Sequence, residues 1–376
     1  MADKPTLMTT KRVWRIVHSE SSTGWGGQEH RVLAELAGFQ RRGSQVWLLA
    51  PARSHIFRRA HERKITAEPL PVVKWQVPFA VLRTARWLRR VKPDVVNTHS
   101  SRDGWIVGLG ARMARVPFII RTRHFDVAIP NRWLSRHVYE SLADHLLTTS
   151  PKVSAHFQTF FQWPLGRVST VPTGIDVELF SPAGPVAELR PAGGGQKRPL
   201  VGIVSVIRHA KGHSILLEAA RLLKDSGFEA HYVVVGDGPV RQRVEEQIQQ
   251  LRLGDCVRIA GHREDVPEVL RALDLLVIPS RHEGVPQIAL QALATRTPVV
   301  GSDVGGIPSV IRHGETGRIV PTEDPAALAA AIRESLTDGE TTRAMTERGR
   351  ALVVAHYNLE GMIESLDALY RRHLTE

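Results

Sequence analysis

The chain has 376 residues, of which 42% are hydrophobic and 23% charged, with one cysteine and a formal net charge of +12. This length predicts two domains, each able to bury a core of its own, and the composition is that of an ordinary globular protein. A single cysteine excludes an intrachain disulfide and a cluster of cysteine metal ligands, while the lack of a signal-peptide pattern and of a long apolar run indicates a cytoplasmic protein without a membrane span.

The first half of the chain alternates between apolar, β-rich runs and segments with helical periodicity, which is typical of a parallel sheet built from βαβ units. Between the first two runs, residues 28–42 place Val32, Leu33 and Leu36 on one face, and Gly43 is suited to end a helix. The runs that predict strands are residues 13–17, 45–50, 94–98, 117–121, 145–149 and 168–171.

The positive charge is concentrated in this first half. Residues 1–180 carry 27 Lys and Arg against 13 Asp and Glu, whereas residues 181–376 carry 23 against 25. Basic residues interleaved with apolar ones suit an anionic membrane surface or a polyanionic ligand, and a solvated surface without a partner is the alternative. The two basic groups are Arg53, Arg58, Arg59, Arg63 and Lys64, and Arg83, Arg86, Arg89, Arg90 and Lys92, the second around Trp87 and Leu88.

Residues 181–198 are dense in proline and glycine, which indicates a linker. The alternation then restarts, with predicted strands at residues 200–207, 230–235, 256–259, 275–278, 298–300 and 317–320.

We therefore predict an α/β fold of two Rossmann-like, doubly wound domains that face a central cleft. The N-terminal domain covers residues 1–180 and the C-terminal domain residues 199–358, and a C-terminal helix at 359–376 is expected to pack back on the N-terminal domain. Ligands of such sheets bind outside the carboxyl ends of the strands, so the loops at these ends are the candidate sites.

Three of these loops carry residues suited to a phosphate group. Gly26 and Gly27 lie in a glycine-rich turn before a helix, where backbone amides can approach an anion, although such turns are also common without a ligand. Arg208 and Lys211 could grip a diphosphate from two sides, or be unpartnered surface cations. Gly236 lies in a third turn, which a structural role alone would explain.

A fourth loop precedes a helix-like segment that begins at Pro286. Proline suits the first position of a helix, so the amides around Val285 and Gln287 would form an anion site. Gln287 and Gln291 share a helix face at a spacing of four. Glu283, before the helix, and Gln291, inside it, would bracket a polyhydroxyl group.

Taken in order, these motifs resemble the retaining glycosyltransferases of family 4, which have the GT-B fold. Residues 283–308 are similar to the donor-site signature of that family. The resemblance implies transfer of a sugar from a nucleotide-diphosphate sugar, held by the second domain, to an acceptor held by the first, without a metal or other cofactor. It continues through residues 173–180, 211–213, 236–239 and 261–267.

The resemblance also implies roles for the residues of the second domain. Glu283 would hold hydroxyls of the donor sugar, and Arg208 and Lys211 would neutralise the leaving diphosphate. Position 291 is glutamine where the family commonly has a second glutamate that grips the ribose, so Gln291 is expected to make a weaker, neutral contact. Ser309 also stands where glutamate is common. The further donor-binding residues are Gly26, Gly27, Val285, Pro286, Gln287 and Gly236.

In the first domain, residues 121–126 resemble the segment whose histidine lies beside the donor sugar, which assigns His124 a catalytic role. A polar cluster after another predicted strand is expected to contact the acceptor. The acceptor candidates are His99, Arg102, Asp103 and Asp126.

The excess positive charge of the first domain favours a glycan or glycolipid acceptor of lipopolysaccharide or other cell-envelope polysaccharide synthesis, met at the inner face of the cytoplasmic membrane. A GT-B synthase with a soluble acceptor and a non-catalytic sugar-nucleotide or polyanion binder are the alternatives. Nucleic acid is not an expected partner, because no groove-reading motif or aromatic stacking platform accompanies the cations.

Overall fold

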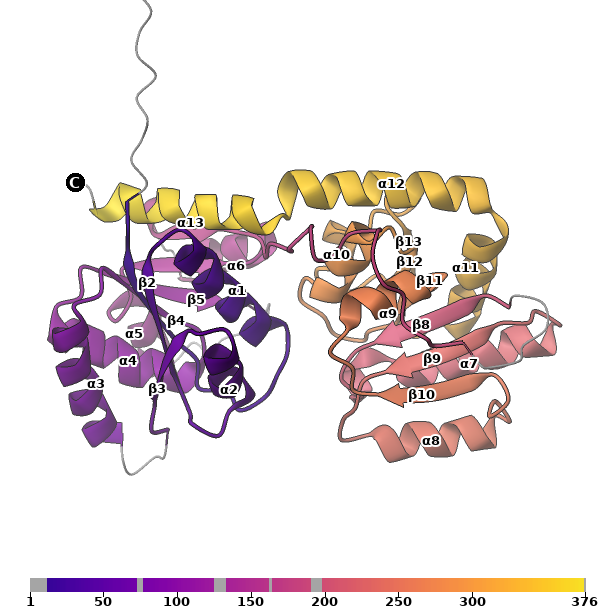
Figure 1. The fold of residues 1–376 in the computed structure, drawn as a ribbon, viewed down its shortest axis with the longest axis horizontal. Coiled ribbons are helices and arrows are strands. Elements are labelled where there is room, and N and C mark those ends of the chain that lie inside the picture. Colours follow the sequence, from indigo (N-terminus) through magenta and orange to yellow (C-terminus); the bar gives the residue numbers. More distant parts are fainter. Residues whose placement is uncertain (1–11, 73–76, 125–132, 162–163, 191–197, 375–376) are drawn as a thin grey trace, which may run out of the picture. The chain divides into compact units, whose positions relative to one another are not determined.

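The computed structural model describes residues 12–72, 77–124, 133–161, 164–190 and 198–374. The chain divides into two compact units (Figure 1). The first unit comprises residues up to Val171 together with the segment from Ile363 onward, and the second runs from Pro172 to Met362.

The first unit contains a seven-stranded parallel sheet with the order β3-β2-β1-β4-β5-β6-β7. The strand order reverses at β1, which pairs with β2 on one side and β4 on the other, so the sheet is doubly wound. The strands are β1 (Arg15–Ser19), β2 (Gln45–Ala50), β3 (Thr66–Pro69), β4 (Val95–Thr98), β5 (Phe118–Arg123), β6 (His145–Thr148) and β7 (Val168–Thr170).

Helices cover this sheet: α1 (Gly27–Arg41), α2 (His55–Glu62), α3 (Val77–Val91), α4 (Ser101–Ala114), α5 (Trp133–Glu140) and α6 (Pro151–Phe161), with a 3-10 turn at Leu165–Arg167. Six of the strands in this sheet correspond to the six segments that were predicted from the sequence to form strands, and the prediction is confirmed for them. The edge strand β3 was not predicted, because its sequence, Thr-Ala-Glu-Pro, lacks the apolar run of a buried strand.

The second unit contains a six-stranded parallel sheet with the order β10-β9-β8-β11-β12-β13. All six predicted strands are present: β8 (Leu200–Val204), β9 (His231–Val235), β10 (Val257–Gly261), β11 (Leu275–Ile278), β12 (Val299–Ser302) and β13 (Arg318–Val320). The helices are α7 (His213–Asp225), α8 (Arg241–Gln250), α9 (Val266–Ala272), α10 (Gln287–Ala294), α11 (Pro325–Thr337) and α12 (Gly339–His356), with 3-10 turns at His209–Lys211 and Ile307–Ser309.

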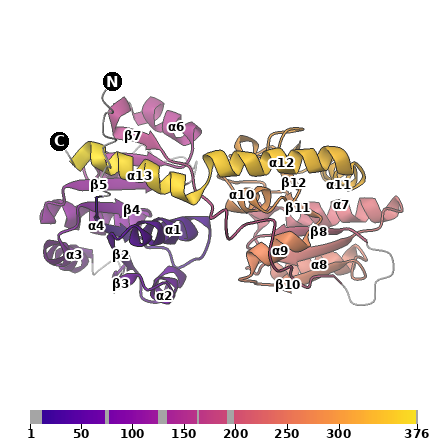
Figure 2. The same ribbon diagram turned by 45° about the horizontal axis from the view of Figure 1, so that its top comes forward.

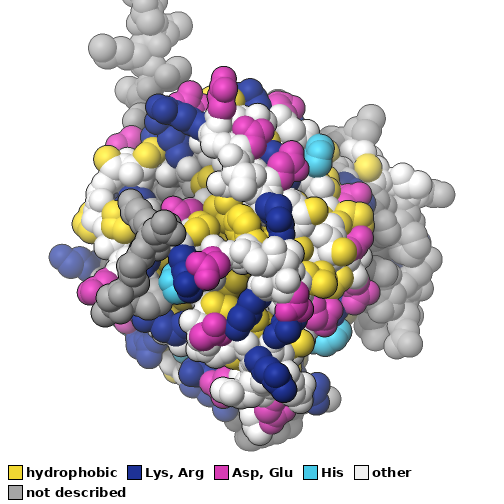
Figure 3. All heavy atoms as spheres, turned by 90° about the vertical axis from the view of Figure 1, so that its right-hand side faces the viewer, with side chains coloured by type: hydrophobic (Ala, Val, Ile, Leu, Met, Phe, Trp, Pro, Cys, Tyr) yellow, Lys and Arg dark blue, Asp and Glu magenta, His cyan; other side chains and the backbone are white. Residues whose placement is uncertain are grey.

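Successive side chains of β11 lie on opposite faces of this sheet, and both faces are buried. Leu275 and Val277 pack into a core with α7, α8 and α11, whereas Leu276 and Ile278 pack into a second core with α9 and α10. The face of this unit turned to the viewer in Figure 3 carries Lys and Arg side chains intermixed with Asp and Glu, as expected from the nearly balanced charge of residues 181–376.

The described part of the proline- and glycine-rich segment, residues 181–190, packs on the second unit and is not a free linker. Ala187 and Leu189 are buried in the core of the second unit. Arg271 donates from Nη1 to the Ser181 carbonyl oxygen at 2.9 Å and from Nε to that of Pro185 at 2.7 Å. The second unit therefore begins at Pro172, earlier than the expected boundary at 180, and residues 181–190 belong to it; residues 191–197 lie outside the described ranges.

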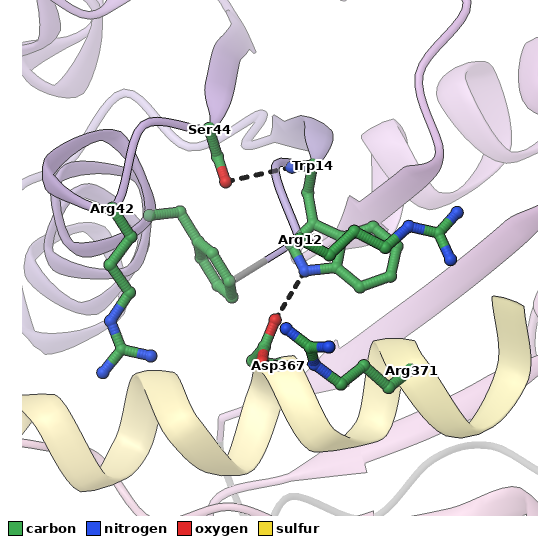
Figure 4. Close-up of a pocket in the computed structure, with 7 residues that line it drawn as sticks. Arg12, Trp14, Arg42, Ser44, Asp367 and Arg371 are labelled. Carbon is green, nitrogen blue, oxygen red and sulfur yellow. Dashed lines mark hydrogen bonds and ion pairs between the residues drawn. The ribbon is translucent and has the colours of Figure 1, made fainter. Parts of the chain in front are cut away.

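The last helix, α13 (Leu359–Leu374), completes the first unit from Ile363 onward. Trp14 Nε1 donates to Asp367 Oδ1 at 2.6 Å, with Arg371 beside the same carboxylate (Figure 4). The Tyr370 ring stacks on Phe39 of α1, with ring centroids 5.3 Å apart, and Figure 2 shows this part of α13 running alongside α1. A residue more than 350 positions from β1 thus closes the core of the same unit.

Candidate functional site

In the second unit, two predicted catalytic residues meet at the carboxyl ends of adjacent strands. Lys211 follows β8 and Glu283 follows β11, and Lys211 Nζ lies 2.5 Å from Glu283 Oε2. The Ser280 hydroxyl donates to the same oxygen at 3.1 Å. The two side chains remain partly exposed, at 27% and 13%, so a ligand can reach the pair.

Arg208 lies on the same turn as Lys211, since the Arg208 carbonyl oxygen accepts the Lys211 amide at 2.9 Å. Its side chain is exposed, and no hydrogen bond joins it to another described residue. The turn therefore presents two cations next to the Glu283 carboxylate, an arrangement that suits a diphosphate with an attached polyhydroxyl group.

Arg281, which the sequence patterns did not single out, joins the two loops. Its backbone amide donates to the Ala210 carbonyl oxygen at 2.8 Å, and its Nη1 donates to that of His209 at 2.9 Å. Its Nε lies 2.7 Å from Glu323 Oε1. These contacts fix the turn that carries Lys211 against the loop that carries Glu283.

Glycines let these loops pack backbone to backbone. Gly305 has a φ of +59°, and a Cβ there would lie 1.8 Å from the Glu283 carbonyl oxygen. Gly236 has a φ of +143°, and its Cβ would lie 1.9 Å from the Ser205 carbonyl oxygen. The glycine at 236 is therefore required by the fold itself, and its predicted donor contact stays a prediction.

Helix α10 begins at Gln287, so Pro286 is its N-cap residue and not its first helical residue as predicted; its ψ of 119° keeps it extended. Val285, Gln287 and Gln291 are half-buried. No hydrogen bond joins the Gln291 side chain to another described residue, whereas the exposed Ser309 hydroxyl donates to the Gly306 carbonyl oxygen at 2.6 Å.

In the first unit, the glycine turn lies between β1 and α1. Gly26 is the N-cap residue of α1 with a φ of −165°, an extended conformation that any residue adopts. A Cβ there would meet only Glu29 Oε2, at an ordinary 3.6 Å. Neither the backbone nor crowding within the unit therefore requires glycine at 26, which leaves close approach by a ligand as a reason for it. Gly27 follows as the first residue of α1.

A buried carboxyl group that the sequence analysis missed supports this turn. Glu20 accepts hydrogen bonds from the Ser22 amide at 2.7 Å and from the side chains of Gln28 and Ser100. Burial, with the nearby Asp103 carboxyl group as a second cause, raises the pKa of Glu20 to about 7. Its position directly after β1 was the available signal, because strand ends in such sheets are where polar groups converge.

The predicted acceptor-binding residues differ in burial and in hydrogen bonding. Both oxygens of Asp103 accept hydrogen bonds within the unit, from the Ser19 and Ser21 hydroxyls and from the amides of His99 and Ser100. Asp103 thus caps α4. Arg102 is exposed on the first turn of the same helix, and Asp126 lies outside the described residues. An acceptor contact by these residues stays a prediction.

His99 and His124 belong to a row of three buried histidines. His99 Nδ1 lies 2.9 Å from His124 Nε2, and His99 Nε2 lies 2.9 Å from His18 Nδ1. Burial is the main reason that the pKa of all three is lowered, that of His18 to about 3. Among the described residues, no group of three His, Cys, Asp or Glu side chains is arranged to hold a metal ion.

Two family models match the chain. Residues 25–179 match the model of Glycosyltransferase Family 4, and residues 187–352 match that of Glycosyl transferases group 1. An alpha-D-kanosaminyltransferase of Streptomyces kanamyceticus is 30% identical over 83% of this chain and 89% of its own length. A UDP-Gal:alpha-D-GlcNAc-diphosphoundecaprenol alpha-1,3-galactosyltransferase of Escherichia coli is 25% identical over 75% of this chain and 76% of its own.

Among solved structures, Anabaena Alr3699/HepE in complex with UDP-glucose superposes with a TM-score of 0.83 and 18% identity, covering 96% of this chain and all of that one. This likeness and the two parallel sheets confirm the predicted fold class. Because the family models cover both units and the 30% identity extends over most of the chain, this protein belongs to the group 1 glycosyl transferases of family 4 and is a retaining, nucleotide-sugar-dependent glycosyltransferase of GT-B fold.

Proposed function

We propose that this protein transfers a sugar from a nucleotide-diphosphate donor to a glycan or lipid-linked acceptor of lipopolysaccharide or other cell-envelope polysaccharide synthesis, without a metal ion. The observation that carries the proposal is the Lys211–Glu283 pair beside the exposed Arg208. An acid for sugar hydroxyls and two cations for a diphosphate stand together at the carboxyl ends of β8 and β11.

On donor binding, Glu283 accepts hydrogen bonds from sugar hydroxyls, and Lys211 and Arg208 turn to the diphosphate. Negative charge grows on the leaving phosphate oxygen as its bond to the anomeric carbon breaks, and the cations stabilise that charge. The acceptor oxygen bonds to the anomeric carbon on the same face, and its proton passes to the leaving phosphate oxygen. His124 hydrogen-bonds the donor sugar, and Gly26 and Gly27 line the diphosphate.

UDP-sugars are the first donors to test, because the Escherichia coli relative uses UDP-Gal and the Anabaena structure contains UDP-glucose. Gln291 contacts the ribose as a neutral hydrogen-bonding group. Its replacement by alanine is expected to weaken donor binding by about 1 kcal/mol, the typical value of one hydrogen bond. An unchanged donor dissociation constant would leave residue 291 without a role in binding.

The decisive experiment combines thermal shift and product analysis over UDP-, GDP- and ADP-sugars, since a bound donor stabilises the protein by mass action. Glu283→Ala is expected to abolish transfer and leave the melting temperature of the free protein within about 2 °C, because the side chain is partly exposed. Glu229→Gln is the matched control, an exposed acid before β9 that pairs with Arg198. A panel in which no donor stabilises the protein or yields a product would contradict the proposed donor site.

Helix α3 supports a membrane-bound acceptor. Phe79 is 72% exposed and Leu82 is 44% exposed, and the helical spacing places Arg83, Arg86 and Arg90 on the same exposed face. Such a face suits insertion of apolar side chains between anionic headgroups. No helix among the described residues is long and apolar enough to cross a bilayer.

The membrane part of the proposal is tested with liposomes at low salt. The protein is expected to bind vesicles with anionic lipid and not neutral ones, and Phe79→Ser with Leu82→Ser is expected to reduce binding at least tenfold. Val13→Ser, which alters another exposed apolar residue of the first unit, is the control. Indifference to anionic vesicles would instead favour a synthase with a soluble acceptor.

A further inference from the structure

The row of histidines is one continuous hydrogen-bonded chain. It runs from His18 in β1, through His99 directly after β4, to His124 directly after β5. The exposed fractions of the three residues are 0%, 4% and 9%. The neighbouring ring centroids lie 4.9 and 5.1 Å apart. Because β1, β4 and β5 are adjacent in the sheet, the fold itself lines the three rings up.

A chain of neutral imidazoles can carry its protons in only two ways. Each neutral ring has one N–H, and each link needs one donor and one acceptor. Either His124 Nε2 donates to His99 and His99 donates to His18, or His18 Nδ1 donates to His99 and His99 Nδ1 donates to His124. The lowered pKa values of the three histidines support the neutral state.

The buried end of the chain decides between the two directions. His18 Nε2 is buried without a hydrogen-bond partner among the described residues. In the first direction this nitrogen carries the proton and becomes an orphaned buried N–H, which native structures rarely contain. In the second direction the proton is on His18 Nδ1, which lies 3.8 Å from Glu35 Oε2.

Glu35 makes the second direction the favourable one. Arg31 Nε donates to its other oxygen at 2.6 Å, in an ion pair that is fully buried. Burial raises the pKa of Glu35. The ion pair with Arg31 acts in the opposite direction, and this contact is what supports the carboxylate form. A carboxylate oxygen attracts the Nδ1–H of His18 and would repel a bare lone pair at that position.

We infer that His18 and His99 are positioning residues that hold His124 in the tautomer with its proton on Nδ1 and its Nε2 accepting from His99. His124 in this state donates a hydrogen bond through Nδ1 and does not take up the acceptor's proton at Nε2. The inference rests on the proposed placement of His124 beside the donor sugar, and it deepens that role by assigning a donor and excluding a base.

The tautomer can be read directly in the free protein by nitrogen-15 NMR of the imidazoles, since protonated and bare ring nitrogens differ widely in chemical shift. His124→Asn assigns the signals by their loss. We expect a protonated Nδ1 and a bare Nε2 in His124 at pH 7. A protonated Nε2 would overturn the inference, whether or not any sugar is transferred.

Two nearly isosteric variants test the consequence for the reaction. In His99→Asn the amide lies where Nδ1 was and can still donate to His124, whereas the carboxylate of His99→Asp can only accept and forces the proton onto His124 Nε2. We expect kcat/KM to fall by at most about threefold in the asparagine variant and by at least about tenfold in the aspartate variant. Equal losses, or a better aspartate variant, would contradict the inference.

His145 supplies the matched control. It is buried at the start of β6, with a pKa lowered to about 3, and its Nε2 lies 2.9 Å from the Ser169 hydroxyl, outside the chain. His145→Asn and His145→Asp are expected to affect kcat/KM alike. Separately, donor affinity that is unchanged in His124→Ala would contradict the placement of His124 beside the sugar, while the NMR result would still decide the tautomer.

Discussion

Gly26 is a residue whose identity the surrounding protein does not explain. Its extended backbone and its open surroundings would accept a methyl group. We expect Gly26→Ala to keep the melting temperature within about 2 °C and to raise the KM for the donor about tenfold, because the methyl group would occupy space that the proposed diphosphate contact needs. Melting curves and initial rates at varied donor concentration measure both effects.

Alanine variants of two other glycines serve as comparisons for Gly26→Ala. Gly24→Ala, in the same turn, is the control, since its Cβ would meet only the Ser22 hydroxyl at 3.4 Å. Gly236→Ala is expected to lower stability itself, by more than about 1 kcal/mol, because the added atom meets a backbone oxygen. A Gly26→Ala protein that unfolds as readily as Gly236→Ala would show that residue 26 is structural.

Glu20 gives the first unit a pH-dependent stability. Its pKa is raised to about 7 in the folded state, from about 4.5. The folded protein therefore holds this proton more tightly than the unfolded chain, and the contribution to stability is full below pH 4.5 and is lost as pH rises to 7. We expect Glu20→Gln to remove that part of the decline, measured as the difference in unfolding free energy between variant and wild type from pH 4.5 to 7.5. A difference independent of pH would show that the carboxyl group titrates normally.

The roles of Glu20 and His18 were not predicted from the sequence, because they depend on contacts between distant residues. Glu283, Arg208 and Lys211 stand in ordered motifs with recognisable spacing. Glu20, by contrast, acquires its role from Ser100 and Asp103, about 80 positions away, which only the adjacency of β1 and β4 brings near. The Lys211–Glu283 contact is equally invisible in the sequence, because it depends on β8 and β11 being neighbours.

Most strands were predictable from the sequence because buried parallel strands are continuous apolar segments. The edge strand β3 and the packed segment 181–190 were not, since short edge strands and extended segments without their own ladder have little periodicity. Proline and glycine in that segment indicated only the absence of a helix or central strand. Its burial comes from Leu189 and from Arg271, which belongs to α9.

Arg281 holds the loop after β11 against the loop after β8 through its hydrogen bonds to Ala210 and His209. Arg281→Ala removes the hydrogen bond to the His209 carbonyl oxygen and the ion pair to Glu323, so the turn with Arg208 and Lys211 gains freedom. We expect the KM for the donor to rise about tenfold with kcat reduced less, because preorganisation of the proposed donor-binding loop is lost. Steady-state kinetics with varied donor measure the split.

Arg190→Ala is the matched control for Arg281→Ala. Arg190 also forms an ion pair with an acid of the second unit, Asp274, but Asp274 lies directly before β11, at the opposite end of the strand from Glu283. Arg190→Ala is expected to leave KM unchanged. An equal rise in KM for both variants would mean that general loosening of the unit, and not the loop after β8, controls donor binding.

The chain passes from one unit to the other twice, at residues 171–172 and 362–363. The first unit is therefore incomplete until the C-terminal segment has been added. Tyr370 is the clearest case: it is fully buried beside Phe39 and Trp14, and its hydroxyl has no hydrogen-bond partner among the described residues.

Two substitutions of Tyr370 separate packing from polarity. Tyr370→Phe keeps the ring and removes the unsatisfied hydroxyl, so we expect an unfolding free energy equal to or about 1 kcal/mol above that of wild type. Tyr370→Ala leaves a large cavity and should cost about 3 to 5 kcal/mol. Because the ring lies in the first unit, hydrogen exchange followed by mass spectrometry should accelerate in β1, α1 and β5 of the alanine variant while peptides of β8 to β13 keep their protection. Faster exchange in both units alike would mean that the C-terminal helix stabilises the chain as one cooperative block, which the separate cores of the first and second units argue against.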